Sequence, residues 1–372
     1  MLKFNIEKRE GLARVGVIHT PHGDIKTPAF VGAATRATVK ALTFSQMNEL
    51  GSQAVLANTY HLFLKPGANL IREGGGLAEF ISWQKPTFTD SGGFQIFSLP
   101  DVKLTEEGAT FKSHIDGKKF LMTPELSMQT QWEIGADIHM AFDQLAKSES
   151  FEDMRCAMEQ THRWLDRCVA EHENLEKEYM GRGLPEQYLF AVVQGGTFLD
   201  LRKKSAEYMA ELPVDGYGIG GVFTAKGMDK MLETVCSVLP EERPRHLLGM
   251  GQEPVDLFVG AEYGCDTFDC VGPTRMARNG SLYTLDGRIN IKNARFEHDF
   301  MPVMEDCNCE CCKKYTKAYL HHLFKVDEIT GKVLASIHNE HFVVSVVDKI
   351  RDCMLDGSFQ DYKKQFLGRY YD

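Results

Sequence analysis

The feature that most constrains the fold is a series of short apolar segments separated by polar, helix-like stretches. Several segments are apolar almost throughout, as is typical of parallel strands covered on both faces. Eight candidate strands follow one another along the chain: 27–33, 53–59, 86–90, 136–143, 188–196, 216–221, 245–251 and 265–271. Eight strands that alternate with helices predict an α/β protein with a (β/α)8 TIM barrel. Segments 27–33 and 216–221 are weak strands by themselves, so the count of eight depends on them.

The length of the chain and the stretches between the strands agree with one barrel domain over 1–372. A chain of 372 residues is within the range of a single α/β barrel, and no linker rich in Pro, Gly or Ser divides it. Apolar side chains recur at helical spacing over 151–173. Thr123 and Thr43 are N-cap candidates for two further helices.

Composition limits the classes of function. The N-terminus "MLKFNIEKRE" has no apolar h-region, and eighteen apolar residues never run together, which predicts a cytoplasmic protein without a signal peptide or membrane span. The net charge of −10 argues against a surface coated with basic residues for nucleic acid. Residues 275–325 nevertheless hold nine Lys and Arg against six Asp and Glu, so a local basic face can hold phosphates.

Polar residues stand where several of the predicted strands end. Asp90, Asp143 and Asp269 supply three acids. Gln194 precedes two glycines, and the segment 216–221 ends in Gly220-Gly221. The carboxyl ends of barrel strands converge on one mouth, where such enzymes react, so the sequence predicts a single site built from these residues.

Two carboxylates in one mouth suit retaining glycosyl transfer, in which the paired carboxyl groups lie about 5 Å apart. We predict that Asp269 attacks C1′ of a sugar and that Asp90 moves a proton on or off the departing base. Asp143 and Gln194 suit the edge of a purine, because a carboxylate accepts from N–H groups and an amide can donate to a carbonyl.

The neighbours of the two carboxylates suit a nucleic-acid substrate. After Asp90, the stretch 91–93 (Ser-Gly-Gly) permits close backbone approach, and Phe94 offers a flat face for stacking. Arg275 and Arg278 follow the second carboxylate and predict a clamp for phosphates. Segment 216–221 also fits G-x-G-x-x-G, but it lies mid-chain, outside an opening βαβ unit, so a dinucleotide site is the weaker interpretation.

A cysteine cluster and distant histidines predict a metal site. The stretch "DCNCECC" (306–312) supplies Cys-x-Cys-x-x-Cys, and "SIHNEH" adds imidazoles. Three thiolates and one imidazole complete a tetrahedral Zn²⁺ site without a position for water, so we predict one structural zinc ion per chain, in a zinc-binding subdomain over 286–345. The preferred ligands are Cys307, Cys309, Cys312 and His338. Cys311 is an alternative to the third thiolate, and the alternatives to the imidazole are His321, His322 and His341.

Eight motifs occur in order over nearly the whole chain: "NTYHLFLKPG", "DSGGFQIFS", "VVQGG", "IGG", "FDCVGPTRMARNG", "INIKNARF", "CxCxxC" and "AYLHHLF". Together they resemble the bacterial type of tRNA-guanine transglycosylase, also called queuine tRNA-ribosyltransferase. The resemblance implies a barrel with a zinc-bearing insertion that exchanges guanine at the tRNA wobble position for a 7-deazaguanine base, in queuosine modification. It also implies a ping-pong reaction through a ribosyl-enzyme intermediate, and a homodimer.

The resemblance assigns roles to particular residues. Asp269 matches the family's nucleophile and Asp90 its general acid/base. Within this substrate class, the phosphates that Arg275 and Arg278 are predicted to clamp are those of tRNA. The residues expected to bind the base are Asp90, Ser91, Phe94, Asp143, Gln194, Gly220, Gly221 and Leu248, of which Phe94 and Leu248 sandwich it. The zinc ligands implied are the preferred set above.

The chain departs from the bacterial pattern beside the expected base pocket. Residues 144–150 read "QLAKSES", Lys226 stands where an acid is expected, and Gly272 stands where leucine is common. A lysine there repels the cationic aminomethyl group of the prequeuine base, unless its side chain points to solvent. Two interpretations stay open: altered base choice, for queuine or a neutral 7-deazaguanine, and ordinary specificity with a tolerated loop variant.

Other classes of protein remain as alternatives. A non-catalytic RNA-binding partner subunit of such an enzyme is the main one, although the presence of both carboxylates and all four metal ligands speaks against it. A transglycosylase that acts on DNA or at another tRNA position is a second. A barrel metallohydrolase is a third, but the cysteine cluster lacks an open coordination position.

Overall fold

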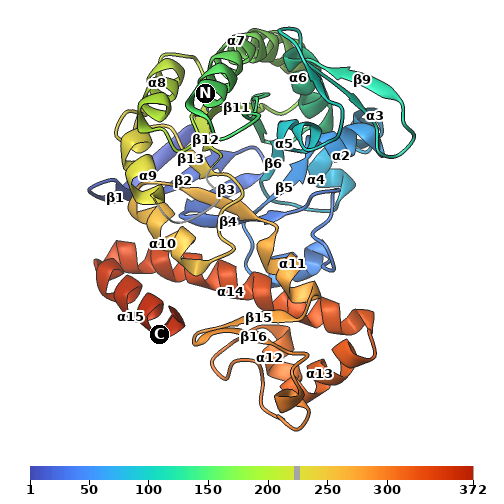
Figure 1. The fold of residues 1–372 in the computed structure, drawn as a ribbon, viewed down its shortest axis with the longest axis vertical. Coiled ribbons are helices and arrows are strands. Elements are labelled where there is room, and N and C mark those ends of the chain that lie inside the picture. Colours follow the sequence, from blue (N-terminus) through green and yellow to red (C-terminus); the bar gives the residue numbers. More distant parts are fainter. Residues whose placement is uncertain (222–226, 372) are drawn as a thin grey trace.

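The barrel forms the larger part of the molecule. The computed structural model describes residues 1–221 and 227–371 (Figure 1). Within them, parallel strands close into a barrel in the circular order β4 (Ala29–Ala33), β5 (Ala54–Asn58), β6 (Thr87–Asp90), β10 (Ile138–Met140), β11 (Tyr188–Val193), β12 (Gly216–Ile219), β13 (Arg245–Leu247) and β14 (Thr267–Cys270). Each strand lies inside one of the eight predicted segments. The predicted (β/α)8 barrel is therefore confirmed.

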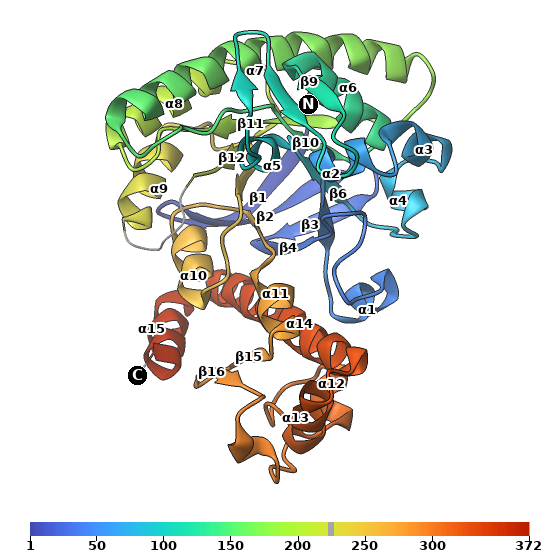
Figure 2. The same ribbon diagram turned by 45° about the vertical axis from the view of Figure 1, so that its right-hand side comes forward.

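Helices alternate with the strands and surround the barrel (Figures 1 and 2). Thr43 and Thr123 cap two of them as predicted, because their side chains accept from the backbone N–H groups of Gln46 and Leu126. The predicted helix over 151–173 continues to Met180, since apolar side chains keep meeting the core. The helices are α1 (Phe44–Glu49), α2 (Thr59–Leu64), α3 (Ala68–Glu73), α4 (Leu77–Phe80), α6 (Pro124–Ile134), α7 (Phe151–Met180), α8 (Leu199–Ala210), α9 (Met228–Cys236) and α10 (Pro254–Glu262).

An N-terminal antiparallel sheet closes one end of the barrel. It consists of β1 (Lys3–Glu10), β2 (Ala13–Thr20) and β3 (Gly23–Thr27), which leads directly into β4. Its apolar side chains Phe4, Ile18 and Ile25 share one hydrophobic cluster with the barrel-lining Phe88 and Phe190. This sheet plugs the barrel by covering the amino ends of the strands. Ligands therefore reach the barrel from the carboxyl ends.

A small sheet lies beside those carboxyl ends. Between β6 and β10, the chain forms α5 (Gly93–Phe97) and the antiparallel strands β7 (Lys103–Leu104), β8 (Ala109–Lys112) and β9 (Lys119–Met122). The turn after β8 contacts α2, where the Tyr60 hydroxyl lies 2.6 Å from Nδ1 of His114. The sheet is thereby held next to the end of β5.

The C-terminal part projects from the barrel at its lower side (Figure 2). It contains α11 (Gly272–Arg278), the hairpin β15 (Ser281–Thr284) and β16 (Gly287–Asn290), η1 (Ala294–Phe296), α12 (Glu310–Lys314), α13 (Lys317–Lys325), α14 (Ile329–Asp356) and α15 (Phe359–Tyr371). Helix α14 packs against α11, α12 and α13 and also against β4, so it belongs to both parts. The subdomain boundaries 286–345 stay a prediction. Among the described residues, every helix is too short or too polar to span a lipid bilayer.

Candidate active site

The carboxyl ends of the barrel strands surround a cavity of about 840 Å³. The structure brings every residue predicted for catalysis, base binding and tRNA binding into its lining. They are Asp90, Ser91, Phe94, Asp143, Gln194, Gly220, Gly221, Leu248, Asp269, Arg275 and Arg278. The placement agrees with a single site, while the role of each residue stays a prediction.

Asp90 ends β6 and is held by donors from the neighbouring strand. Register pairs it with Asn58 of β5, whose Nδ2 donates to Oδ2 of Asp90. The backbone N–H groups of Thr59 and Gly92 donate to Oδ1, both at 3.0 Å. Burial raises the pKa of Asp90, and the charge of Asp269 contributes in the same direction. These hydrogen bonds oppose the shift, and the resulting pKa is about 7. A carboxyl group with that pKa can both give and take a proton near neutral pH.

Asp269 lies in β14 and is oriented through one oxygen. His246 of β13 places Nε2 3.1 Å from Oδ1, and the Gly249 N–H donates to the same oxygen at 2.8 Å. The other ring nitrogen of the fully buried His246 lies 2.8 Å from Oγ1 of Thr267. Within the described residues both contacts of Asp269 fall on Oδ1, so Oδ2 remains for a substrate.

Asp143, Gln194 and Ser91 form a buried polar wall. The Ser91 hydroxyl donates to Oδ1 of Asp143 at 2.9 Å, and Nε2 of Gln194 donates to Oδ2 at 2.6 Å. Burial raises the pKa of Asp143, and both hydrogen bonds oppose that shift. Gly92, with φ +79°, permits the turn behind this wall, because a Cβ there would lie 2.9 Å from the backbone nitrogen of Tyr60.

Two apolar side chains lie at the cavity. Phe94 is the second residue of α5, and it is 52% exposed although it is aromatic. Leu248 follows β13 and also packs against the barrel-lining cluster. A half-exposed ring and an aliphatic side chain at one cavity suit the two faces of a planar ring.

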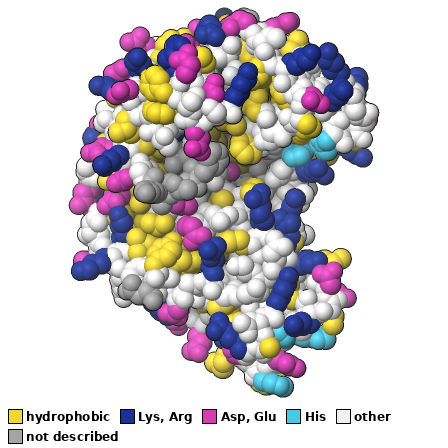
Figure 3. Space-filling view, viewed as in Figure 1, with side chains coloured by type: hydrophobic (Ala, Val, Ile, Leu, Met, Phe, Trp, Pro, Cys, Tyr) yellow, Lys and Arg dark blue, Asp and Glu magenta, His cyan; other side chains and the backbone are white. Residues whose placement is uncertain are grey.

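Four cations lie near the opening of the cavity: Arg36, Lys40, Arg275 and Arg278. Lys40, Arg275 and Arg278 line the cavity. Burial lowers the pKa of Lys40, and the charges of Arg278, Arg36 and Arg275 lower it further. None of them pairs with an acid in the described part of the chain. Lys and Arg side chains also line the hollowed side of the molecule between the barrel and the C-terminal part (Figure 3). This concentration of positive charge suits phosphate groups.

The predicted metal ligands come together in a second, separate cluster. Cys307, Cys309 and Cys312 place Sγ 3.8, 3.7 and 3.3 Å from Nδ1 of His338. Tetrahedral zinc, with Zn–S near 2.3 Å and Zn–N near 2.0 Å, separates such atoms by about 3.6 Å. The other ring nitrogen of His338 lies 2.7 Å from the carbonyl oxygen of Tyr283, which fixes the proton there and leaves Nδ1 to bind a metal. The cluster can therefore hold one metal ion.

The alternative ligands are less well placed. Cys311 is fully buried and belongs to the hydrophobic cluster of the C-terminal part rather than to the ligand group. Nδ1 of His321 contacts the carbonyl oxygen of Ile291 at 2.7 Å. Nδ1 of His341 lies 3.6 Å from Sγ of Cys307, but the group of four ligand atoms is completed by His338.

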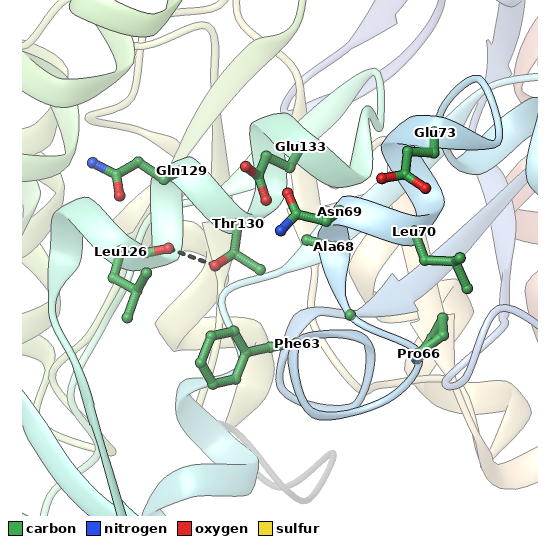
Figure 4. A pocket seen from close by; sticks show the side chains of 11 residues that line it. Phe63, Pro66, Ala68, Asn69, Leu70, Glu73, Leu126, Gln129, Thr130 and Glu133 are labelled. Carbon is green, nitrogen blue, oxygen red and sulfur yellow. Dashed lines mark hydrogen bonds between the residues drawn. The ribbon is translucent and has the colours of Figure 1, made fainter.

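A further cavity, of about 500 Å³, lies outside the barrel between α2, α3 and α6 (Figure 4). It contains none of the predicted site residues. Its acids are Glu73 and Glu133, and Glu133 already pairs with Arg72 at 3.6 Å. The two residues joined in the close-up, Thr130 and Leu126, form an ordinary hydrogen bond within α6.

The sequence did not predict several residues that support the site. Asn58 and Thr59 hold Asp90, and His246 holds Asp269. Asn58 and Thr59 lie within "NTYHLFLKPG" at the end of a predicted strand, and that position was the available signal. His246 sits inside an apolar strand, where its partner on the neighbouring strand is not visible in the sequence.

The fold and the site together define a class: a (β/α)8-barrel enzyme whose carboxyl-end cavity holds two carboxylates, beside a Cys3His metal cluster. Residues 9–372 match the family model described as Queuine tRNA-ribosyltransferase. The chain is 43% identical to the queuine tRNA-ribosyltransferase of Halothermothrix orenii, over 99% of this chain and 98% of that protein. It is 44% identical to that of Symbiobacterium thermophilum, over 96% and 88%. The chain belongs to the queuine tRNA-ribosyltransferase family and is a glycosyltransferase.

Proposed function

We propose that this enzyme exchanges the wobble-position guanine of tRNA for a 7-deazaguanine base through a covalent ribosyl-aspartate intermediate. The observation that carries the proposal is the presence of Asp90 and Asp269 in one cavity, close enough for the charge of Asp269 to raise the pKa of Asp90. Membership of the family supports the same reaction.

In the first half of the reaction, Oδ2 of Asp269 attacks C1′ of the ribose. The C1′–N9 bond to guanine breaks, its electron pair goes to the base, and Asp90 protonates the departing guanine. Asp90 is then ionised. In the second half it takes a proton from the incoming base, whose nitrogen attacks C1′ and displaces Asp269.

We assign recognition of the base to the polar wall and the two apolar side chains. The Asp143 carboxylate accepts from the N–H groups of a purine, and Gln194 keeps one amide N–H for a carbonyl. Ser91 orients Asp143. The backbone at Gly220 and Gly221 completes the edge, and Phe94 and Leu248 cover the two faces of the ring.

We assign the phosphates of the RNA to the cations at the opening of the cavity. Arg275 and Arg278 lie on α11, directly after the strand that carries Asp269. Arg36 and Lys40 add charge from the loop after β4. Such contacts fix the position of the RNA without reading its sequence.

We propose zinc as the metal of the Cys3His cluster, because three thiolates and an imidazole match its preferred tetrahedral set. A bound zinc would join α12 and the loop before it to α14 through Cys307, Cys309, Cys312 and His338. No step of the exchange is assigned to it. The homodimer and the cytoplasmic location remain predictions from the sequence.

The choice of incoming base remains open between the two interpretations. Lys226 lies outside the described residues. Leu145, from the departing stretch 144–150, lines the cavity. Gly272 is explained by packing, because a Cβ there would lie 2.9 Å from the side chain of Gln252 and 3.1 Å from Sγ of Cys270. Incorporation measured separately with the aminomethyl base, queuine and a neutral 7-deazaguanine decides between them, and a clear preference for the aminomethyl base ends the idea of altered choice.

The proposed function is tested by incubating the purified chain with tRNA labelled in its wobble guanine. Release of labelled guanine, together with the modified nucleoside after digestion, is the expected result. No release by the chain alone, with release restored by a second protein, would favour the alternative of a non-catalytic partner subunit.

A further inference from the structure

Arg202 of α8 is buried without an acidic partner in the described part of the chain. Its side chain is completely covered, yet it carries a charge that is costly to remove from water. Burial lowers its pKa to about 10, so it stays charged near neutral pH. A buried cation of this kind has to be stabilised by neutral dipoles.

Three backbone carbonyls supply those dipoles. Nε of Arg202 donates to the Gly196 oxygen at 2.7 Å, and Nη1 donates to the Val193 oxygen at 2.8 Å. Nη2 donates to the Gly220 oxygen at 2.6 Å. The guanidinium thus joins the carboxyl ends of β11 and β12, which carry Gln194 and Gly221 into the cavity.

The direction of the Gly220 carbonyl fixes the direction of the next N–H group. The peptide between Gly220 and Gly221 is trans, so its C=O and N–H point in opposite directions. Gly220 and Gly221 line the cavity, whereas Arg202 lies behind them and does not. Because the carbonyl points to Arg202, the Gly221 N–H points away from Arg202.

In the described part of the chain, the hydrogen bond from Arg202 restrains this peptide. Gly221 has φ +74°, a conformation that glycine adopts readily and that leaves a peptide free to rotate. The space behind it is filled by the guanidinium, because a Cβ on Gly221 would lie 3.3 Å from Nη2 of Arg202. A cation on the carbonyl also polarises the peptide and strengthens its N–H as a donor.

We propose that Arg202 is a positioning residue for base selection: it aims the Gly221 N–H at the carbonyl of a 6-oxopurine and holds Gln194 beside it. This inference rests on the proposed function. Arg202 is not among the residues that line the cavity, so it acts through the two strand ends. Its loss should weaken recognition of the base much more than recognition of the RNA.

The experiment measures guanine exchange with Arg202→Met and Arg202→Lys. For Arg202→Met, KM for guanine is expected to rise about tenfold or more, and KM for tRNA to change by less than about twofold. Arg202→Lys keeps one cationic donor and is expected to fall between Arg202→Met and the parent. Preference for guanine over 2,6-diaminopurine, which has an amino group in place of the carbonyl, is expected to fall in the same order.

Arg245→Met is the matched control. Arg245 is also buried and donates to a backbone carbonyl, that of Leu239, but it begins β13 at the plugged end of the barrel. Its loss is expected to lower thermal stability without changing base preference. Either of two results would overturn the inference. One is an unchanged KM for guanine in both Arg202 variants, and the other is a change in KM for guanine no larger than the changes in the other kinetic constants. If Arg202→Met does not fold, Arg202→Lys decides. If the parent enzyme exchanges no guanine at all, the proposed function fails first.

Discussion

Asn58 donates to Asp90 and lowers its pKa against the effect of burial, so replacement of Asn58 by serine should move the pH profile of base release. Asn58→Ser removes the Nδ2 donor to Asp90 but keeps an oxygen at the N-cap of α2. A hydrogen bond to an ionised group contributes about 1.5–3 kcal/mol, and one pH unit corresponds to about 1.4 kcal/mol. The pKa of Asp90, about 7 in the parent, should therefore rise by about one to two pH units.

The assay is single-turnover release of labelled guanine from tRNA without an incoming base. This half-reaction requires protonated Asp90, so its rate in the parent should fall as the pH rises through about 7. In Asn58→Ser the fall should occur at higher pH, because loss of the donor favours the neutral carboxyl group. Asn293→Ser, at a distant cap of η1, serves as the control and should not move the profile. An unchanged profile in Asn58→Ser, or a shift to lower pH, would refute the assignment of Asp90 as the acid.

Three further substitutions test other parts of the account. His246→Phe keeps the volume of the ring but removes the partner of Asp269, so kcat should fall about tenfold or more with little change in either KM, as steady-state kinetics would show. A fall confined to KM would contradict that role. Arg275→Ala should weaken tRNA binding and reduce the slope of its salt dependence by about one; lower guanine affinity alone would contradict a phosphate contact. Cys309→Ser should lower both bound zinc and thermal stability, and unchanged metal content would exclude this ligand.

The sequence predicts the barrel because most of its buried strands leave a local signal, while 27–33 and 216–221 were recognised from the alternation of the whole series. Segments such as 188–196 are apolar on both faces, and that property alone marks a parallel strand covered on both sides. The small sheet β7–β9 was not predicted, since its strands are only two to four residues long and each carries a lysine. Helix α7 was predicted too short because charged residues over 173–178 hide the buried positions Leu175 and Tyr179.

The sequence predicts site residues that stand at the ends of strands. It does not predict residues that support the site through contacts with a neighbouring strand or helix. Asp90, Asp143 and Asp269 stand at strand ends, so topology alone gathers them. His246 contacts Asp269, which lies 23 residues away on the neighbouring strand. Arg202 of α8 donates to the carbonyl of Gly220, which lies 18 residues away at the end of β12. A single sequence contains no sign of such pairings, because they depend on barrel register and on where α8 packs. The metal site forms the opposite case, since the cysteine spacing predicts it locally, although the choice of Cys312 over Cys311 and of His338 over the other histidines depended on the structure.

The central claim is that Asp269 bonds to the ribose while Asp90 serves the departing base. The most direct measurement is to mix the enzyme with tRNA in the absence of an incoming base, denature it, and locate the RNA adduct by mass spectrometry of the digested protein. The account predicts an adduct on the peptide that contains Asp269, its retention in Asn293→Ser, and its absence in Asp269→Asn. An adduct on any other residue, or one that persists in Asp269→Asn, would contradict the account.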